Sequence, residues 1–390
     1  MSMQWFYACP ECGATYDIVP GRYLCDACAQ AQQSERPLAG VLEVEWSGDV
    51  AADMIPLPVE PRWFPPIPVG ETPLWAPTRL RAQFGAPGLW LKDDTCNPSG
   101  SFKDRASYLV AAFAKQHGVQ EIVLASTGNA ASSMAAVGAA AGLRVKVFLP
   151  AAAPVAKRIQ VLQYGAELVS VAGNYDKAYD LSLEYSQRTG ALSRNTAYNP
   201  LTIEGKKTVS YEIVADLTRA GAGAPDHVFV PVGDGVILAG VYRGFENLLR
   251  LGRLQKMPTV WACQAEGSSA IARALLTPHS ETDPFGPPVA ATTLADSISV
   301  DVPRNGLHAL GKLRKHGGRA VVVSDADILA AQKTLASNSG LFGEPSSCAA
   351  FAGWLKVRDT LPADANSVVM ITGSGLKDIA SAARGLGINT

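Results

Sequence analysis

The sequence has little net charge and few charged side chains for its length. Charged residues make up 18% of the 390 positions, and 34 Lys and Arg against 35 Asp and Glu leave a formal net charge of −1. A chain so close to neutral has no general electrostatic attraction for nucleic acid or for acidic membrane surfaces. We therefore expect neither nucleic acid nor a membrane among its partners.

Long hydrophobic runs and a signal peptide are also missing. The longest apolar stretches are rich in Ala and Gly and are interrupted by Ser, Asn or charged residues, so none is predicted to span a bilayer. Residues 1–10 contain no basic stretch followed by an apolar run of the kind that directs secretion. These absences lead us to expect a cytoplasmic protein.

Two common functional patterns are absent as well. The five histidines, His117, His227, His279, His308 and His316, form no HxxxH or HxH pair, so none is predicted to bind a metal or to catalyse a reaction. No GK[ST] sequence occurs, which excludes the ATP-type phosphate loop that carries this signature.

Four of the seven cysteines lie in two CxxC pairs near the N-terminus. Cys9-Pro-Glu-Cys12 and Cys25-Asp-Ala-Cys28 are separated by 12 residues. This spacing is typical of a zinc ribbon, in which four thiolates hold a tetrahedral zinc and leave no open coordination position. We therefore predict a structural zinc site, with a degenerate ribbon that has lost its metal as the alternative. Cys96, Cys263 and Cys348 are expected to be small buried apolar residues.

The remaining chain divides into an irregular segment and a long regular body. Residues 31–70 hold seven prolines between Pro37 and Pro68 and are predicted to form a linker that wraps onto the body. From Gly70 onward, short apolar runs typical of buried strands alternate with longer Ala-rich segments typical of helices. Such alternation predicts parallel sheets with helices on both faces, and about 320 residues are enough for two α/β units.

The predicted elements of the body can be given by their ranges. The strands are Glu121–Ala125, Arg144–Leu149, Glu167–Val171, His227–Pro231, Thr259–Gln264, Arg319–Val323 and Ser367–Ile371. The helices are Asp104–His117, Ala130–Ala141, Ala156–Tyr164, Tyr175–Thr189, Ile237–Leu251, Asp325–Asn338 and Ser346–Arg358.

The stretch Asn97-Pro-Ser-Gly-Ser-Phe-Lys-Asp-Arg105 places a lysine where a loop meets a predicted helix. The positive end of the helix dipole disfavours an ammonium group there and helps to lower the pKa of Lys103. A lysine that loses its proton near neutral pH can form a Schiff base with an aldehyde. From spacing alone, a solvated lysine in a polar turn is the alternative.

The stretch Val230-Pro-Val-Gly-Asp-Gly-Val-Ile-Leu-Ala-Gly240 combines a strand, a glycine-rich turn and a helix start. Backbone N–H groups in such a turn form a cradle for an anion, and the helix N-terminus favours a phosphate. The glycine pattern is GxGxxxxG and differs from the dinucleotide-binding GxGxxG. Asp234 is expected to point away from an anion. A tight turn without a ligand is the alternative.

Two further turns between a strand and a helix or loop are rich in small polar residues. Ala125-Ser-Thr-Gly-Asn-Ala130 offers hydroxyl and N–H groups to a carboxylate, and Asn129 could hydrogen-bond a phenolate oxygen. The alternative is that Ser or Asn simply caps the helix. In Met370-Ile-Thr-Gly-Ser-Gly-Leu-Lys-Asp378, Thr372 or Ser374 could bond a ring nitrogen, with an ordinary strand-to-helix turn as the alternative.

Together these stretches resemble the threonine synthase family, within the fold-type II pyridoxal-phosphate (PLP) enzymes. Family runs of the type NPTGSFKDR, ASTGN, EGxKT, VPxGxxG, EPxSA and TGxGLKD occur in order. Here they are Asn97-Pro-Ser-Gly-Ser-Phe-Lys-Asp-Arg105, Ala125-Ser-Thr-Gly-Asn129, Glu204-Gly-Lys-Lys-Thr208, Val230-Pro-Val-Gly-Asp-Gly235, Glu344-Pro-Ser-Ser-Cys348 and Thr372-Gly-Ser-Gly-Leu-Lys-Asp378. Gly70-Glu-Thr-Pro-Leu74 resembles the segment that usually precedes them, so the likeness covers roughly residues 70–380.

The resemblance implies a fold and a domain order. The fold is α/β, with two doubly wound parallel-sheet domains of the tryptophan synthase β-like type and a small N-terminal zinc ribbon, which several threonine synthase-like proteins carry. We expect the zinc-ribbon-like module in residues 1–35, the large PLP-binding domain in residues 36–104 and 200–390, and the small domain in residues 105–199.

The resemblance also implies roles for individual residues. Lys103 forms the Schiff base with PLP and moves protons. The substrate carboxylate is held by Ser126, Thr127 and Gly128, with Asn129 near the phenolate oxygen of PLP. The PLP phosphate accepts hydrogen bonds from the backbone N–H groups of Gly233, Asp234, Gly235, Val236 and Ile237. Thr372 contacts the pyridine nitrogen. A hydroxyl at that nitrogen leaves it largely unprotonated, which favours elimination and replacement over transamination.

The chain departs from the family pattern at two positions. Thr202 stands where the family often has an Arg, two residues before Glu204-Gly205, and Asp234 stands where the phosphate turn usually has Asn. If the missing Arg normally helps to hold a substrate phosphate, Lys157 and Arg158 are candidates for that task. The alternative for these two is a solvated helix face.

The resemblance implies a PLP-dependent carbon–oxygen lyase with the activity of threonine synthase, which converts O-phospho-L-homoserine and water to L-threonine and phosphate. A first alternative is β-elimination or β-replacement, as in serine or threonine dehydratase-like and cysteate synthase-like enzymes. A second alternative is a non-catalytic regulatory homologue. Because family members are commonly dimers, we expect a homodimer.

Overall fold

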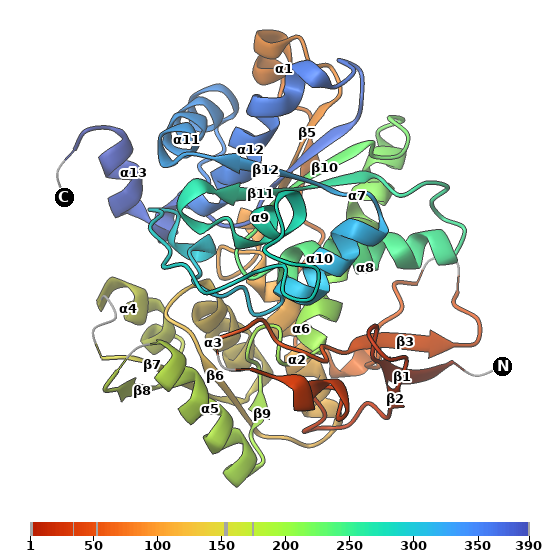
Figure 1. Cartoon of the computed structure of the whole chain (residues 1–390), viewed down its shortest axis with the longest axis vertical. Coiled ribbons are helices and arrows are strands. Elements are labelled where there is room, and N and C mark those ends of the chain that lie inside the picture. The colour runs from red at the N-terminus through yellow and green to blue at the C-terminus, as the bar shows by residue number, and fades with distance from the viewer. Residues whose placement is uncertain (1–2, 34, 52–53, 152–154, 174, 389–390) are drawn as a thin grey trace.

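Two parallel sheets and one small antiparallel sheet organise the chain in the computed structural model, which describes residues 3–33, 35–51, 54–151, 155–173 and 175–388. The side chains of residues 155–157 are not among those described. Figure 1 shows the larger sheet and its helices above the smaller sheet, with the N-terminal strands to the right. No helix within these ranges is long and apolar enough to cross a bilayer.

The larger sheet has six strands in the order β12–β11–β10–β13–β5–β4. Neighbouring strands pair in parallel except β4, which runs antiparallel to β5 at one edge. The strands are β4 Leu74–Trp75, β5 Leu89–Asp93, β10 His227–Pro231, β11 Thr259–Ala265, β12 Arg319–Val323 and β13 Ser367–Ile371.

Helices cover both faces of the larger sheet. Successive side chains of a strand point to opposite faces, and Phe229 of β10 belongs to one buried cluster while Val228 and Val230 belong to another. Phe351 of α12 packs in the first cluster and Phe245 of α8 in the second. The helices are α1 Thr78–Phe84, α7 Thr208–Arg219, α8 Val236–Arg250, α9 Ala270–Leu276, α10 Gly306–Lys315, α11 Asp325–Ser339, α12 Pro345–Val357 and α13 Ile379–Gly385.

The smaller sheet has four parallel strands in the order β8–β7–β6–β9. Leu109 of α2 and Met134 of α3 pack in the cluster on one face, and Tyr179 of α5 packs in the cluster on the other. The strands are β6 Glu121–Ala125, β7 Arg144–Pro150, β8 Glu167–Val171 and β9 Leu192–Ser193. The helices are α2 Lys103–Gln116, α3 Asn129–Ala141, α4 Val155–Gln163, α5 Tyr175–Thr189 and α6 Leu201–Glu204.

Short 3-10 helices join several of these elements. They are η1 Cys28–Ala31, η2 Pro61–Trp63, η3 Asp94–Cys96, η4 Gly205–Lys207, η5 Glu266–Ser268, η6 Asp296–Ile298, η7 Arg358–Thr360 and η8 Gly375–Lys377.

The N-terminal sheet corrects the prediction that residues 31–70 are only a linker. Strands β1 Gln4–Ala8, β2 Thr15–Tyr16 and β3 Glu43–Ser47 form an antiparallel sheet in the order β2–β1–β3. The third strand forms because its side chains alternate between the two faces of the sheet, and Val44 and Trp46 are buried on one of them. This sheet therefore extends past residue 35, whereas the division of the body at residues 104/105 and 199/200 stays a prediction.

The fold class is confirmed: two doubly wound parallel-sheet units form an α/β body. Five of the seven predicted strands have the observed bounds, and β7 and β11 are each one residue longer. The seven predicted helices agree with observed helices within one residue at each end. The sequence-based prediction did not include β4, β5, β9, α1, α6, α7, α9, α10 or α13.

Two helical glycines allow a test of how closely α8 packs. A Cβ on Gly244 of α8 would lie 2.4 Å from the Lys207 carbonyl oxygen, whereas a Cβ on the exposed Gly311 of α10 meets nothing within 4 Å. Gly244→Ala is expected to lower the free energy of unfolding by about 1–3 kcal/mol through overpacking. Gly311→Ala is expected to raise it by about 0.5–1 kcal/mol through helix propensity. Urea denaturation midpoints check both shifts, and shifts of the same sign would contradict the close packing.

Candidate active site

The candidate site lies at the carboxyl ends of the strands of the larger sheet, next to the smaller sheet. Gly233 follows β10, Thr372 follows β13, and the loop that leads to Lys103 follows β5. In open parallel sheets, ligands bind at these ends because the loops between strands and helices converge there. In Figure 1, α2 and α3 extend from this region into the lower layer, beside the smaller sheet.

The loop that carries Lys103 is fixed by the C-terminal turn. Ser101 and Gly373 form an antiparallel bridge, and the Phe102 N–H donates to the Thr372 carbonyl at 2.8 Å. Lys103 is then the first residue of α2, one residue earlier than the predicted helix start. Two loops far apart in the sequence thus hold one lysine in place.

The Lys103 amine lies in surroundings that favour its neutral form. Burial lowers its pKa, and the nearby Asp234 carboxylate opposes this effect. Within the described residues, no hydrogen bond or ion pair engages its Nζ atom. A buried, unengaged amine with a lowered pKa, close to the turn at residues 233–235, is the arrangement that Schiff-base chemistry requires.

The turn after β10 needs glycine for steric reasons. A Cβ on Gly233 would lie 2.8 Å from the Ile298 Cα, and a Cβ on Gly235 would lie 2.7 Å from the Ala309 Cβ. Gly235 also has a φ of +88°, in the left-handed region that side chains disfavour. The two glycines therefore bring bare backbone close to the start of α8.

Residues 233–237, which we term the phosphate loop, end on a helix N-terminus without a side-chain cap. Val236 begins α8, and no side chain accepts its free N–H groups, whereas Ser324 caps α11 through a reciprocal capping box. The Asp234 carboxylate accepts from the Arg304 N–H at 3.2 Å. Uncapped N–H groups at a helix start fit a phosphate.

The turn before α3 is also free of a side-chain cap. Ser126, Thr127 and Gly128 precede the helix, and its N-cap residue is Gly128, which has no side chain to cap it. The Ser126 hydroxyl accepts from the Gly128 N–H at 3.2 Å. A Cβ on Gly128 would meet nothing within 4 Å, so open space adjoins the turn. The Asn129 amide instead donates to the two Glu344 carboxylate oxygens at 3.0 and 3.1 Å.

Glu344 is a site residue to which the sequence assigned no role. It precedes α12, is 4% exposed, and its burial raises the pKa of its carboxyl group. A Cβ on Gly373 would lie 2.6 Å from its Oε1 atom, so the carboxylate occupies space that glycine leaves. Nearby, the Thr372 hydroxyl lies 3.2 Å from the Ser347 hydroxyl. The Glu-Pro pair of the fifth motif, EPxSA, was the available signal for Glu344.

Arg194 is a second residue that the sequence reasoning missed. It follows β9 at the carboxyl end of the smaller sheet, is 0% exposed, and contacts the hydroxyls of Ser107 and Thr196. Its Nη2 atom is buried without a hydrogen-bond partner. Burial lowers the pKa of Arg194 to about 10. Since its charge also acts on Lys103, this guanidinium lies near the reactive amine with donor capacity to spare.

Lys206 adds a second buried amine to the same region. Burial, followed by the charges of Arg194 and Lys103, lowers its pKa well below the ordinary value. Its Nζ atom donates to the Thr202 carbonyl at 2.8 Å. Asp234 is the acidic group that opposes these shifts, and burial raises its own pKa. The region therefore combines Lys103, Arg194 and Lys206 around the carboxyl group of Asp234.

Lys157 lies in α4, but its side chain is outside the described residues, so its role as a substrate ligand stays a prediction.

Cys263 and Cys348 are buried, as expected, but Cys96 is exposed. That expectation was wrong because Cys96 ends the short helix η3 at the surface of the loop before Lys103.

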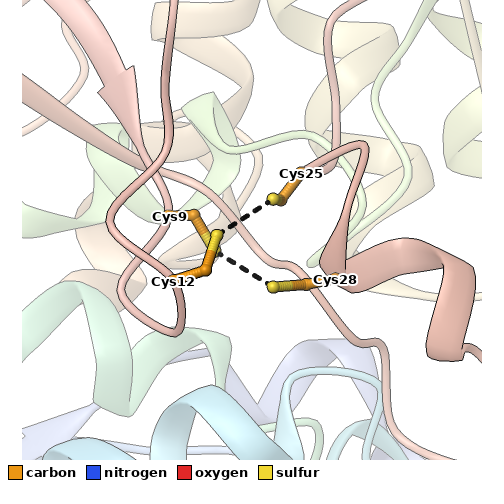
Figure 2. A group of neighbouring side chains, drawn as sticks. All are labelled: Cys9, Cys12, Cys25 and Cys28. Carbon is orange, nitrogen blue, oxygen red and sulfur yellow. Dashed lines mark hydrogen bonds between the residues drawn. The ribbon is translucent and has the colours of Figure 1, made fainter.

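The four paired cysteines form one cluster, away from this site. Their Sγ atoms all lie within 4.8 Å of one another, with Cys12 and Cys25 at 3.5 Å and Cys9 and Cys28 at 3.8 Å. Figure 2 shows the four side chains converging from two loops. In a tetrahedron with Zn–S bonds of about 2.3 Å the sulfur atoms are about 3.8 Å apart. The cluster therefore has the size of a four-thiolate zinc site.

The site's own geometry fits PLP. Lys103 has a buried amine with a lowered pKa, the phosphate loop has uncapped N–H groups, and Thr372 has a buried hydroxyl. These groups would suit the aldehyde, the phosphate and the ring nitrogen of PLP. The family model described as pyridoxal-phosphate dependent enzyme matches residues 67–373. The chain therefore belongs to the PLP-dependent enzymes.

Within that class the chain belongs to the threonine synthase family. It is 34% identical over 387 residues to a threonine synthase of Methanosarcina acetivorans, covering 95% of this chain and 91% of that protein. It is 31% identical over 397 residues to a threonine synthase of Methanocaldococcus jannaschii, covering 96% and 94%. These alignments confirm the resemblance found in the motifs, and they extend over the N-terminal segment.

Solved structures confirm the fold. Threonine deaminase isoform 2 of Solanum lycopersicum, in its processed form, superposes with a TM-score of 0.68 at 22% identity and covers 82% of this chain and 88% of that chain. Maize serine racemase superposes with a TM-score of 0.68 at 21% identity and covers 82% and 92%. The body of the chain has the fold-type II architecture.

We expect reduction with borohydride to fix PLP to Lys103. Peptide mass mapping of the reduced holoenzyme should locate the label on residue 103, and Lys103→Ala should lose both the label and the Schiff-base absorbance band. Lys206→Met removes the other buried amine near this position and should keep both signals. A label on Lys206 in the wild-type protein would contradict the assignment.

Proposed function

We propose that this chain is a threonine synthase, a PLP-dependent lyase that converts O-phospho-L-homoserine and water to L-threonine and phosphate. Membership of the threonine synthase family supports the assignment. The feature of the site that supports a phosphorylated substrate is the buried guanidinium of Arg194, whose Nη2 atom has no hydrogen-bond partner.

Arg194 supports an anionic leaving group because a buried cation needs a counter-charge. An unpaired guanidinium in a dry site costs free energy that an anionic ligand can recover. The PLP phosphate would occupy the phosphate loop, which leaves the Arg194 guanidinium for a second anion. A substrate with a phosphate on its side chain supplies that anion, whereas serine and threonine do not.

The other residues of the site have these proposed tasks. Ser126, Thr127 and Gly128 hold the substrate carboxylate at the uncapped start of α3, with Asn129 beside the phenolate oxygen. The PLP phosphate is held by the N–H groups of Gly233, Asp234, Gly235, Val236 and Ile237. Thr372 offers its hydroxyl to the ring nitrogen, and Lys157 is a further candidate for the substrate phosphate.

When bound, PLP supplies an electron sink for charge that develops on the substrate. Lys103, freed by the substrate amino group, removes the proton at the α-carbon and then one at the β-carbon, so that the bond from the γ-carbon to phosphate breaks. Both protons return, one to the γ-carbon and one to the α-carbon. Water adds its hydroxyl at the β-carbon and gives its proton to phosphate. One poised amine can serve each of these transfers.

A substrate panel tests the assignment and separates it from the alternatives. The holoenzyme is supplied with O-phospho-L-homoserine, O-phospho-L-serine, L-serine and L-threonine, and phosphate and amino-acid products are measured. Equimolar phosphate and threonine from the first substrate support the proposal. Turnover of β-substituted substrates alone would establish elimination or replacement at the β-carbon, and spectral changes without any turnover would establish a regulatory homologue.

We expect Arg194→Met to raise the KM for O-phospho-L-homoserine about 10- to 100-fold, the value of a lost charged hydrogen bond. The affinity for L-serine, followed by the change in PLP absorbance, should change much less because serine has no phosphate. Arg194→Lys should recover part of the loss. Arg219→Met, at a site where the side chain is 76% exposed, is the matched control and should leave both values unchanged. Equal losses for the two ligands would contradict the assigned role.

We also propose that Cys9, Cys12, Cys25 and Cys28 hold a structural zinc ion. The spacing of their sulfur atoms supports this, as does the absence of disulfides among the described cysteines. The Cys25 N–H donates to the Gly40 carbonyl at 2.8 Å, so the metal would fasten the segment before β3 to the loop that ends β1. Four thiolates leave no position for catalysis.

Elemental analysis is expected to find one zinc ion per chain. Cys12→Ser should lose the metal and lower the thermal midpoint, because metal binding contributes to folding of such modules. Cys96→Ser changes an exposed thiol outside the cluster and should keep the full metal content. At saturating PLP, the Schiff-base band of Cys12→Ser should persist. Full zinc content in Cys12→Ser would refute the assignment.

A homodimer and a cytoplasmic location complete the proposal. Ile159 and Leu162 of α4 and Leu376 and Ile379 near the C-terminus are exposed apolar side chains, of the kind that a partner subunit covers. Light scattering in solution tests the dimer, and a monomeric mass would refute it.

A further inference from the structure

We propose that His308 is a positioning residue for the phosphate loop and makes cofactor affinity depend on the N-terminal sheet. The proposal concerns the binding of PLP, so it goes beyond the proposed function and holds whichever amino acid is the substrate. It depends on a series of buried contacts that runs from the phosphate loop through α10 to β3.

The first contacts join Asn305 to the phosphate loop. The Asn305 Nδ2 atom donates to the Gly235 carbonyl at 3.2 Å, and its backbone N–H donates to the Asp234 carbonyl at 3.1 Å. Asn305 precedes α10 and is 0% exposed. Because α8 begins directly after Gly235, the orientation of this carbonyl sets the direction of the first free N–H groups of α8. Asn305 thus holds the loop through two of its backbone carbonyls.

The next contact fixes the orientation of Asn305 itself. Since its Nδ2 atom faces Gly235, its Oδ1 atom faces His308, whose Nδ1 atom lies at 3.3 Å. An amide oxygen only accepts, so the His308 Nδ1–H is the donor. Rotation of the Asn305 amide by half a turn would place an N–H against the His308 N–H and a carbonyl against the Gly235 carbonyl. The Gly235 carbonyl and the His308 Nδ1–H each match one end of this amide, and together they hold the orientation that supports the phosphate loop.

The other side of the His308 ring is held by the N-terminal sheet. Its Nε2 atom lies 2.6 Å from the Glu43 Oε1 atom. Glu43 begins β3 and pairs with Ala8 of β1, the residue before Cys9 of the cysteine cluster. Burial opposes ionisation of Glu43, but Arg243 and other cations hold its pKa well below the usual range. A fixed carboxylate at this position keeps the ring turned toward Asn305.

The ion cluster around Glu43 does not need His308 for its own balance. Arg243 Nη1 lies 2.9 Å from Glu43 Oε2, and Lys312 Nζ lies 2.6 Å from Glu43 Oε1. Both cations also pair with Glu246. Replacing His308 therefore leaves the cluster with its counter-ions, and the contact that disappears without a substitute is the one to Asn305. This separates a positioning role from a role in stability alone.

Three substitutions of His308 test the proposal in the full-length protein. Asn places an amide N–H near the position of Nδ1, within reach of Asn305, whereas Gln places one near Nε2, within reach of Glu43. We expect His308→Ala and His308→Gln to weaken PLP binding to the apoenzyme about 3- to 10-fold, the value of one neutral hydrogen bond. His308→Asn should retain more of the affinity than His308→Gln. Titration of apoenzyme with PLP, followed by absorbance, gives the dissociation constants.

Two further readings keep the test specific. The 31P resonance of bound PLP should move in the Gln and Ala variants and stay close to the wild-type position in the Asn variant. Asn305→Ala combined with His308→Ala should bind PLP no more weakly than Asn305→Ala alone, because both act through one contact. If His308→Gln binds PLP better than His308→Asn, or if the two losses add, the proposal is overturned. The Asn and Gln variants decide the question even where His308→Ala does not fold.

Discussion

The chemistry of this protein depends on the removal of one amine from water. Lys103 begins α2 with its Nζ atom near Asp234, and burial favours the neutral form that can attack an aldehyde. Lys103 is also held by contacts from outside its own helix. The bridge between Ser101 and Gly373 joins the lysine loop to the turn after β13. The larger sheet, which places β5 and β13 side by side, is therefore the support on which the reactive amine depends.

A second constraint concerns α3 and α8, which begin at the site without a side-chain cap, as several other helices of the chain also do. The four N–H groups at a helix start need acceptors, and α11 satisfies its own through Ser324. Helices α3 and α8 leave theirs free at the site, and α8 does so behind a glycine with a positive φ. Their stability comes instead from burial, since most residues of both helices are inside the molecule. Packing therefore stabilises both helices without a cap, and in the proposed function their free N–H groups bind the PLP phosphate and the substrate carboxylate.

The sequence predicts the body of the fold well and the detail of the site unevenly. Strands of the sheet interior, such as β10 and β13, have apolar runs between turn residues, and their bounds follow from that pattern. Strand β3 was missed because its two glutamates, Glu43 and Glu45, are residues typical of loops. Arg243, whose positive charge compensates their burial, lies about 200 positions away in the sequence. Motifs located Lys103 and the phosphate loop. Arg194 and His308 belong to no motif, and their importance comes from contacts that only the folded chain creates.

Thr202, the departure from the family pattern that cast doubt on a phosphorylated substrate, takes on a different meaning in the folded chain. The guanidinium that the family often has at this position is absent, yet Lys206, one helical turn later, donates to the Thr202 carbonyl. Arg194 approaches the same region from the carboxyl end of β9, and its charge acts on both Lys103 and Lys206. Burial lowers the pKa of Lys206 and raises the pKa of Asp234 and of Glu344. The guanidinium of this region therefore comes from position 194 and not from position 202, and a buried guanidinium with an unpartnered donor is better matched to a substrate with a second anionic group than to an uncharged side chain.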